Sequence, residues 1–437
     1  MHTIIKKCRS CQYEHLEPIL NLGETCFGGL LSEDQDEDTM TAPLVLVFCP
    51  HCSLVQINAT MPREILLLHD SAYYFPSSPA KLNYFREIAQ RIIACRRLSA
   101  NSLVIETAGK EGYALQSFVE KGIQTIGIVP DAAAAKTAMR RGINTLNTFF
   151  SRQLAETLRD RGKRADIFIA NNLPAVPDLN DTVDGLKTIL KNDGLAVVEV
   201  PYLLGMIDNN QFDMICHQRL SYFTATSLDR LFRRHGLYLN HLEQTALHGG
   251  SLRVFVEPIE NVQESVRIRL DFENGRGINT MQPYAEFADN VQRVRRSLKT
   301  VLLDLKESGQ RIVGYGAGAR ATTLLNYCGI DQAILDYIVD MNPLKQGHFM
   351  CGSHLPVYSP NKLVEDMPGY VVILALNYAN EIIHQQQTYY LRGGEFIIPV
   401  PSPSIINEDE IYAILSQKRM NTGEKNRPLP LPVQSPG

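Results

Sequence analysis

The chain has 437 residues, 44% of them hydrophobic, and a formal net charge of -4. A chain of this length is too long to fold around one compact core, and we expect about two to four domains. A membrane span needs about 18 or more consecutive apolar residues, and the sequence has no such run. The N-terminal segment is too short and too polar to be a secretory signal. Acidic and basic residues are intermixed along the chain, which disfavours nucleic acid as a partner. We expect a cytoplasmic monomer or homodimer that binds a small molecule.

Two pairs of cysteines lie near the N-terminus, Cys8 with Cys11 and Cys49 with Cys52. Each pair has the Cys-x-x-Cys spacing that turns two thiolates toward one centre, and four thiolates in a tetrahedron suit zinc. A closed four-sulfur site leaves no open position for a substrate. We therefore predict a structural zinc that folds a domain over residues 1–68.

The total of nine cysteines is odd, which favours reduced thiols and a metal site over a disulfide framework. Cysteines outside the two pairs, among them Cys26 and Cys351, are interpreted as small buried side chains. Cys216 is kept open as a functional residue because of its neighbours in sequence.

A strand, a glycine turn and a helix are predicted after a helical stretch at residues 82–97. The apolar run at 102–105 predicts a buried strand, and the following turn holds Glu106, Gly109 and Gly112. This is a nucleotide-binding arrangement, in which glycine lets the backbone approach the cofactor. We predict an α/β, Rossmann-like domain over residues 69–258.

The second strand, at 125–130, is expected to end in an acidic residue that binds ribose hydroxyls. The strand runs into Val129, and Asp131, the acidic residue near its end, lies two residues further on. Asp131 either reaches round to the ribose or caps the helix that starts at Ala132. Both interpretations stay open.

Two later strands bring polar residues to the same edge of the sheet. The strand at 165–170 leads to Asn171, and the strand at 194–200 ends with Glu199. Functional groups of parallel-sheet enzymes gather at such strand ends. Glu199 is our first candidate for a catalytic carboxylate.

Residues 215–223 form a strip with Cys216, His217, Gln218, Arg219 and Tyr222. Gln cannot take up a proton, and Arg stays protonated. His217 is thus the strip's candidate base, and His248 is a second one downstream.

In the last third of the chain, the sequence pattern predicts connecting helices over 259–308 and a second Rossmann-like domain over 309–415. Its strand at 311–315 meets a glycine turn, whose backbone N–H groups suit a phosphate. The Pro-rich end, residues 416–437, lacks a core pattern and is predicted to be disordered.

These elements resemble the three-domain sugar C-methyltransferases, which use S-adenosylmethionine (SAM) to methylate a carbon of nucleotide-linked keto-deoxysugars in natural-product biosynthesis. Residues 215–223 resemble that family's Tyr-His-Glu-His-(Leu/Phe)-Ser-Tyr-Phe element, and residues 315–320 resemble its Tyr-Gly-Ala-x-Ala-Lys element. The resemblance implies an N-terminal zinc module, a central class I SAM methyltransferase domain and a C-terminal Rossmann-like domain.

The resemblance also implies roles for individual residues. The implied catalytic residues are His217, Arg219, Tyr222, Glu199 and His248. The implied SAM-binding residues are Tyr74, Ser77, Glu106, Gly109, Gly112, Asp131 and Asn171. The implied substrate-binding residues are Tyr315, Gly316, Gly318, Arg320, Asn326, Asp340, Lys345 and Asn377.

Several family positions are altered. Cys216, Gln218 and Arg219 replace Tyr, Glu and His, Ala175 replaces another His, and Val129 replaces the ribose-binding Glu. One hypothesis is a C-methyltransferase with a non-standard base. The alternative is a descendant that no longer methylates and serves other chemistry, binding or assembly. A nicotinamide-dependent oxidoreductase is disfavoured because no full GxGxxG with a following acid is present.

Overall fold

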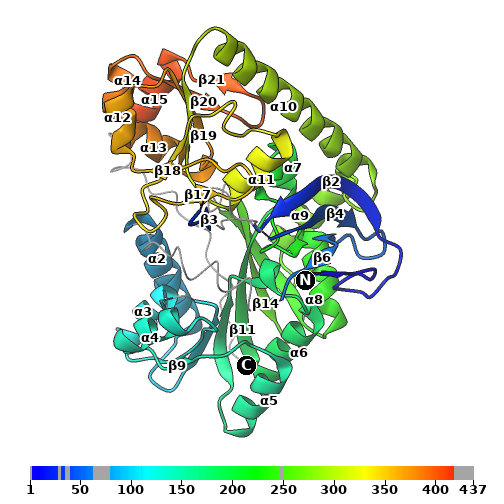
Figure 1. Cartoon of the computed structure of the whole chain (residues 1–437). Helices are drawn as coiled ribbons and strands as arrows, with labels where there is room; N and C mark the ends of the chain where they lie inside the picture. Colours follow the sequence, from blue (N-terminus) through cyan, green and yellow to red (C-terminus); the bar gives the residue numbers. More distant parts are fainter. Residues whose placement is uncertain are drawn as a thin grey trace.

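The computed structural model describes residues 2–27, 31–34, 40–62, 79–109, 111–245 and 250–417 (Figure 1). Its N-terminal part is an antiparallel sheet in the order β12-β5-β4-β2. Those strands are β2 (Glu17–Cys26), β4 (Thr41–Phe48), β5 (Val55–Ile57) and β12 (Ser221–Tyr222). Since β12 comes from the candidate catalytic strip, the zinc module and the central domain share a sheet. The short strands β1 (Thr3–Ile4) and β6 (Ala59–Thr60) pair beside it.

The central domain is a seven-stranded sheet in the order β13-β14-β11-β10-β7-β8-β9. Its strands are β7 (Leu103–Thr107), β8 (Gln124–Ile128), β9 (Thr145–Leu146), β10 (Ala165–Ala170), β11 (Leu190–Pro201), β13 (Tyr238–Thr245) and β14 (Ser251–Glu257). The run from β9 to β11 is parallel, whereas β14 and β13 are antiparallel. Every residue of β7 is buried, as expected for a strand covered on both faces.

Helices cover this sheet on both faces. They are α2 (Pro79–Arg96), α3 (Tyr113–Val119), α4 (Ala132–Arg140), α5 (Arg152–Asp160), α6 (Leu179–Ile189), α7 (Leu203–Asp208) and α8 (Ala225–Arg234). Short 3-10 turns are η1 (Leu173–Ala175) and η2 (Phe212–Met214). Separate hydrophobic clusters lie on the two faces of the sheet, so the predicted α/β layering is confirmed.

Two helices, α9 (Glu264–Gly275) and the long α10 (Gln282–Glu307), lead to the C-terminal domain. Its sheet has the order β18-β16-β15-β19-β20-β21. The strands are β15 (Ile312–Tyr315), β16 (Ile338–Val339), β18 (Val357–Tyr358), β19 (Tyr370–Ile373), β20 (Glu395–Ile398) and β21 (Ser404–Ile405). The helices are α11 (Ala319–Cys328), α12 (Asn361–Asp366), η4 (Leu376–Tyr378), α13 (Ala379–Gln385), α14 (Gln387–Leu391) and α15 (Glu408–Gln417).

One hydrophobic cluster joins the N-terminal sheet to α10 and α11. For example, the Phe48 ring lies 4.8 Å from the Tyr284 ring, and both side chains are almost fully buried. Strand β3 (Leu31–Ser32) also pairs with β17 (Phe349–Met350) of the C-terminal domain. Within the described ranges, no helix combines the length and apolar character needed to cross a membrane.

Candidate active site and zinc site

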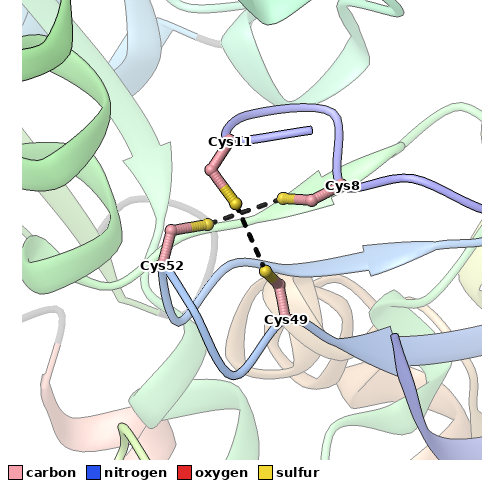
Figure 2. Close-up of side chains that lie close together, drawn as sticks. All are labelled: Cys8, Cys11, Cys49 and Cys52. Atoms are coloured by element: carbon pink, nitrogen blue, oxygen red, sulfur yellow. Dashed lines mark hydrogen bonds between the residues drawn. The ribbon is translucent and has the colours of Figure 1, made fainter. Parts of the chain in front are cut away.

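The four N-terminal cysteines converge on one point (Figure 2). Their sulfur atoms, from Cys8, Cys11, Cys49 and Cys52, all lie within 4.8 Å of one another. Each knuckle is closed by a backbone hydrogen bond, such as that from the Cys49 N–H to the Leu54 carbonyl. Four thiolates in a closed cluster fit zinc, and they leave no coordination position for a substrate. The structure thus brings together the predicted ligands.

Glu106 lies beneath the first glycine turn, at the end of β7. Its side chain is 3% exposed, and its Oε2 atom has no hydrogen-bond partner among the described residues. Burial raises the pKa of Glu106 to about 8. A Cβ atom at Gly109 would overlap the Glu106 carboxyl group, so any side chain there would displace that group. A buried carboxyl group without a partner fits the ammonium group at the amino-acid end of SAM.

Asp131 caps α4 at the end of the second strand. Its Oδ1 atom accepts a hydrogen bond from the Ala134 N–H at 2.6 Å. This confirms the capping interpretation of Asp131, and one of its oxygens is thereby engaged. The Val129 side chain is buried and brings no polar group to the ribose end. Asn171, exposed at the end of β10, lines a cavity of about 20 Å³ with Glu199.

Glu199 is engaged at both carboxylate oxygens. The Tyr84 hydroxyl of α2 donates to Oε1 at 2.5 Å, and Arg253 Nε, from the neighbouring strand β14, donates to Oε2 at 3.2 Å. The Arg253 guanidinium also donates to the Tyr84 hydroxyl and to Glu243. Burial and the Glu199 charge raise the pKa of Tyr84. This network fastens α2 to the sheet, and it limits Glu199 as a proton acceptor.

In the candidate catalytic strip, Tyr222 and Cys216 are in contact. The Cys216 N–H donates to the Tyr222 hydroxyl at 3.1 Å, and burial raises the pKa of Tyr222. Arg219 is half-buried and makes no ion pair with the described residues, although its charge acts on the Tyr222 phenol. Gln218, also half-buried, lies between these residues in sequence.

His217 points toward the N-terminal part. Its side chain is 1% exposed, its ring meets the Phe27 ring edge-on at 5.5 Å, and neither ring nitrogen has a hydrogen bond of good geometry among the described residues. Burial lowers the pKa of His217, and the nearby carbonyls of Pro43 and Ala42 offset part of that effect. The imidazole is therefore neutral near pH 7. The other candidate base, His248, lies outside the described residues, as do Tyr74 and Ser77.

The second glycine turn, residues 316–318, lies between β15 and α11. The charged side chains around it are paired with other residues of the protein. Arg320 forms an ion pair with the buried Asp213 of η2 and donates to Asn377. Lys345 Nζ donates to the Ala317 carbonyl at 2.6 Å and lies 3.4 Å from Asp340. The substrate-binding role of Arg320 stays a prediction, and in this structure its charge is already paired.

The remaining predicted substrate residues surround the same turn. Asp340 accepts from the Ala317 N–H at 2.7 Å, and the Tyr315 hydroxyl is buried, which raises its pKa to about 12. Gly316 has φ +105°, and Gly318 is the N-cap of α11. Asn326 lies against the backbone of Gly352.

Sequence reasoning missed several residues that the structure places at these sites. Arg253 and Tyr84 were not singled out, although an Arg opposite Glu199 is a recognisable cross-strand pair once the strands are aligned. Cys26 and Cys351, interpreted as separate buried thiols, form a disulfide instead. Their separation of 325 residues gave no signal, because only the fold brings their Cα atoms to 5.9 Å.

Together, a zinc-type cysteine cluster, a parallel α/β sheet and a buried carboxyl group under its first glycine turn define a Rossmann-like methyltransferase with an added zinc module. Three family models match the sequence: a zinc binding domain (residues 8–66), a methyltransferase domain (81–242) and a C-methyltransferase C-terminal domain (246–401). The C-methyltransferase NovU of Streptomyces niveus is 32% identical over 414 residues, which cover 93% of this chain and 98% of NovU.

The chain therefore belongs to this family of C-methyltransferases, and its class is that of a SAM-dependent methyltransferase with a structural zinc domain. Among solved structures, a Burkholderia thailandensis 1,6-didemethyltoxoflavin-N1-methyltransferase is 15% identical, with 47% of this chain and 95% of that chain covered and a TM-score of 0.34. The methyltransferase CalO1 of calicheamicin biosynthesis is 16% identical, with 40% and 55% covered and a TM-score of 0.31. The assignment rests on the sequence matches.

Proposed function

We propose that this enzyme transfers a methyl group from SAM to a carbon of a nucleotide-linked keto-deoxysugar, as a cytoplasmic step of natural-product biosynthesis. The observation that carries the SAM half is the buried carboxyl group of Glu106 under a glycine turn, whose Oε2 atom has no hydrogen-bond partner among the described residues. The match to NovU, which is named as a C-methyltransferase, along 93% of this chain supports carbon as the methyl acceptor, and the sugar half rests on the resemblance of residues 215–223 and 315–320 to the sugar C-methyltransferase elements.

On the cofactor side, Glu106 would hold the ammonium group of SAM, while Gly109 and Gly112 let the backbone come close. Asn171 and the second carboxylate oxygen of Asp131 are proposed to bind the nucleoside end. Tyr74 and Ser77 complete the proposed cofactor set. When bound, SAM supplies an electrophilic methyl group.

On the acceptor side, the sugar must lose a proton beside its carbonyl group before a carbon–carbon bond can form. A base for that step must be unprotonated near neutral pH. His217 meets this condition because burial keeps its imidazole neutral, and His248 is the second candidate. Arg219 brings a positive charge beside Tyr222 that forms no ion pair with the described residues, and this charge would stabilise an enolate oxygen.

Glu199 is proposed to act by holding other residues in place. With Arg253 it fixes Tyr84 and hence α2 over the cavity that Asn171 lines. The nucleotide part of the substrate is proposed to lie at the second glycine turn. Gly318 opens α11 there, and the N-terminus of a helix attracts phosphate.

The direct test is a methyl-transfer assay with zinc-loaded enzyme, isotopically labelled SAM and nucleotide-linked 4-keto-6-deoxysugars, with products resolved by mass spectrometry. We expect a product heavier by one methyl group whose label sits on carbon. His217→Ala and Arg219→Lys then separate the roles. Loss of activity in Arg219→Lys but not in His217→Ala would reject His217 as the base.

The second candidate function is a family descendant that binds a nucleotide-linked ligand without methylating it. The observation in its favour is the altered strip, in which Gln218 and Arg219 stand where the family places Glu and His. The two functions differ in one outcome, because this descendant would bind the nucleotide sugar and yield no labelled product at any enzyme concentration.

A further inference from the structure

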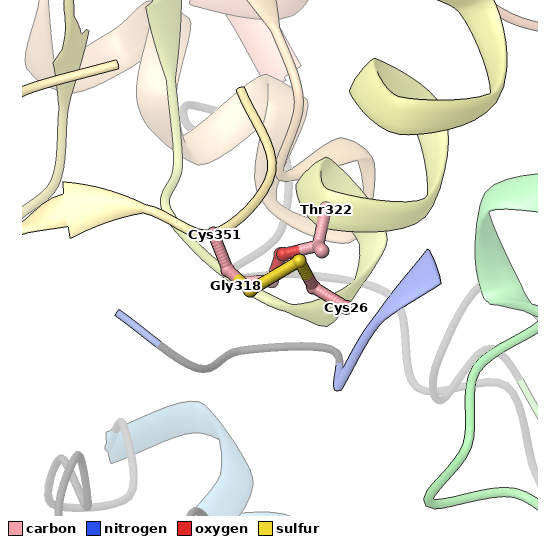
Figure 3. The surroundings of a disulfide bond; sticks show 4 residues. All are labelled: Cys26, Gly318, Thr322 and Cys351. Carbon is pink, nitrogen blue, oxygen red and sulfur yellow. A yellow bond between two sulfur atoms is a disulfide. The ribbon is translucent and has the colours of Figure 1, made fainter. Parts of the chain in front are cut away.

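A disulfide joins the first and last parts of the molecule (Figure 3). Cys26 is the final residue of β2, Cys351 follows β17, and both side chains are buried, at 2% and 0% exposed. The bond lies beside Gly318 and Thr322, at the beginning of α11. It therefore stands at the second glycine turn.

The segments on either side of the bond lead to two candidate sites. Phe27, the next residue after Cys26, packs its ring against His217 of the catalytic strip. Gly352, the next residue after Cys351, lies tightly against Asn326 of α11. The disulfide thus connects the surroundings of the candidate base to the turn proposed for the nucleotide.

Beside this bond, the described residues of β3 and β17 form a small joint. Strands β3 and β17 pair through only two residue pairs, Phe349 with Ser32 and Met350 with Leu31. The larger N-terminal sheet, in contrast, is held to α10 and α11 by a shared hydrophobic core. Breaking the disulfide should therefore loosen the segments around it without separating the domains.

The chemistry of the location favours reversible exchange. The positive end of the α11 dipole stabilises a thiolate, and the thiolate is the form that attacks a disulfide. In a thiol-reducing compartment, disulfides that form are typically transient or redox-sensing. A buried bond reacts only after local opening, so its exchange is gated by the small joint described above.

We propose that Cys26 and Cys351 form a reversible redox latch that controls local order at the second glycine turn and at His217. In the closed state the disulfide pins the Phe27 segment and the 351–354 turn. A dithiol reductant opens the latch by taking over the disulfide and leaving two protein thiols, and a small-molecule disulfide closes it in the reverse exchange. This proposal goes beyond the methyl-transfer function and does not depend on it.

The test uses the full-length protein with zinc kept in excess. After equilibration with oxidised glutathione, non-reducing peptide mapping should show a cross-linked peptide that contains Cys26 and Cys351. Hydrogen–deuterium exchange is then compared with and without a phosphine reductant. We expect reduction to speed exchange about tenfold at residues 316–322 and 349–354, because the local opening free energy falls, and to leave β7 and β10 unchanged.

Variants give the matched controls. Cys26→Ser and Cys351→Ser should show fast exchange without reductant, whereas Cys328→Ser, which removes a buried but unbonded thiol of α11, should still respond to reductant. The wild-type comparison needs no variant, so a folding defect in Cys26→Ser does not spoil the test. Free alkylation of both cysteines after oxidation, or equal exchange in the two redox states, would overturn the latch. S-adenosylhomocysteine (SAH) affinity, measured in parallel, reports separately on the first turn.

Discussion

The two glycine turns of this enzyme look alike in sequence and differ in how their charges are balanced. At the first turn, the buried carboxyl group of Glu106 has an oxygen without a partner. At the second turn, Arg320 is paired with Asp213, and Lys345 lies beside Asp340, although Asp213 Oδ1 and Arg320 Nη2 also lack hydrogen-bond partners among the described residues. The first turn is thus prepared for a cation such as an ammonium group. The difference teaches that an ionisable group without an opposite charge beside it, more than glycine spacing, indicates which turn awaits a charged ligand.

The largest expected effect comes from breaking the ion pair at the second turn. Asp213→Ala should lower the free energy of unfolding by about 3–5 kcal/mol, because it leaves the Arg320 charge buried without its partner. Urea unfolding measures the change. The control is Asp336→Ala, which removes a more exposed carboxylate at Lys306 and Arg311 and should cost about 1 kcal/mol or less. Similar losses in both variants would mean that the second turn is not held by a buried pair.

A smaller effect is expected when the first turn loses its charge. Glu106→Gln keeps the shape of the side chain but removes its ability to ionise against a bound ammonium group, so SAH affinity should fall about tenfold to a hundredfold. Isothermal titration calorimetry measures it. Asp340→Asn, the matched change at the second turn, should leave SAH affinity unaltered, and a loss there would contradict the proposed separation of the two turns.

Substitutions of one glycine in each turn test the same difference between the first and the second turn. In Gly109→Ala the new methyl group would push the Glu106 carboxyl group aside, so SAH affinity should drop about tenfold with little change in stability. In Gly316→Ala the methyl group would meet Ala375 at a φ of +105°, so stability should fall by about 1–3 kcal/mol with SAH affinity kept. Calorimetry measures SAH affinity, and urea unfolding measures stability. A loss of stability in Gly109→Ala together with a loss of SAH affinity in Gly316→Ala would contradict the proposal that SAH binds at the first turn.

A pH dependence is also expected at the first turn. The pKa of Glu106 is raised to about 8, so the folded protein holds this proton more tightly than the unfolded chain does. Its contribution to stability is present below the unfolded pKa and is lost as pH rises from about 4.5 to about 8. SAH affinity should instead rise up to this range, by at most about tenfold per pH unit, because the ionised carboxylate binds the cation. Titrations between pH 6 and 8 should show the rise in wild type, and Glu106→Gln should be flat.

Sequence patterns predicted much of the architecture. The two Cys-x-x-Cys pairs, the strands at 102–105 and 311–315, and the helical stretch at 82–97 all appear where periodicity and spacing place them. Each of these signals is local, since it depends on residues close together in the chain. Helix α15 continues to Gln417, just past the predicted domain boundary, and the rest of the tail lies outside the described residues.

The contacts that the sequence could not predict are long-range ones. The pairing of Arg320 with Asp213, the fixing of Glu199 by Tyr84 and the disulfide of Cys26 with Cys351 each depend on how separate elements pack. The role of Asp131 was ambiguous for a related reason, because capping and ribose binding use the same carboxylate. The roles of the catalytic strip stay predictions.

The most direct test of the central claim is isothermal titration of the folded, zinc-loaded protein with SAM and SAH, run side by side on wild type and Glu106→Gln. The account predicts binding at about micromolar affinity or tighter in wild type and clear weakening in the variant. No detectable binding to folded wild-type protein would contradict it. The first turn would then not be a methyl-donor site, and the enzyme's function would have to be sought at the second turn.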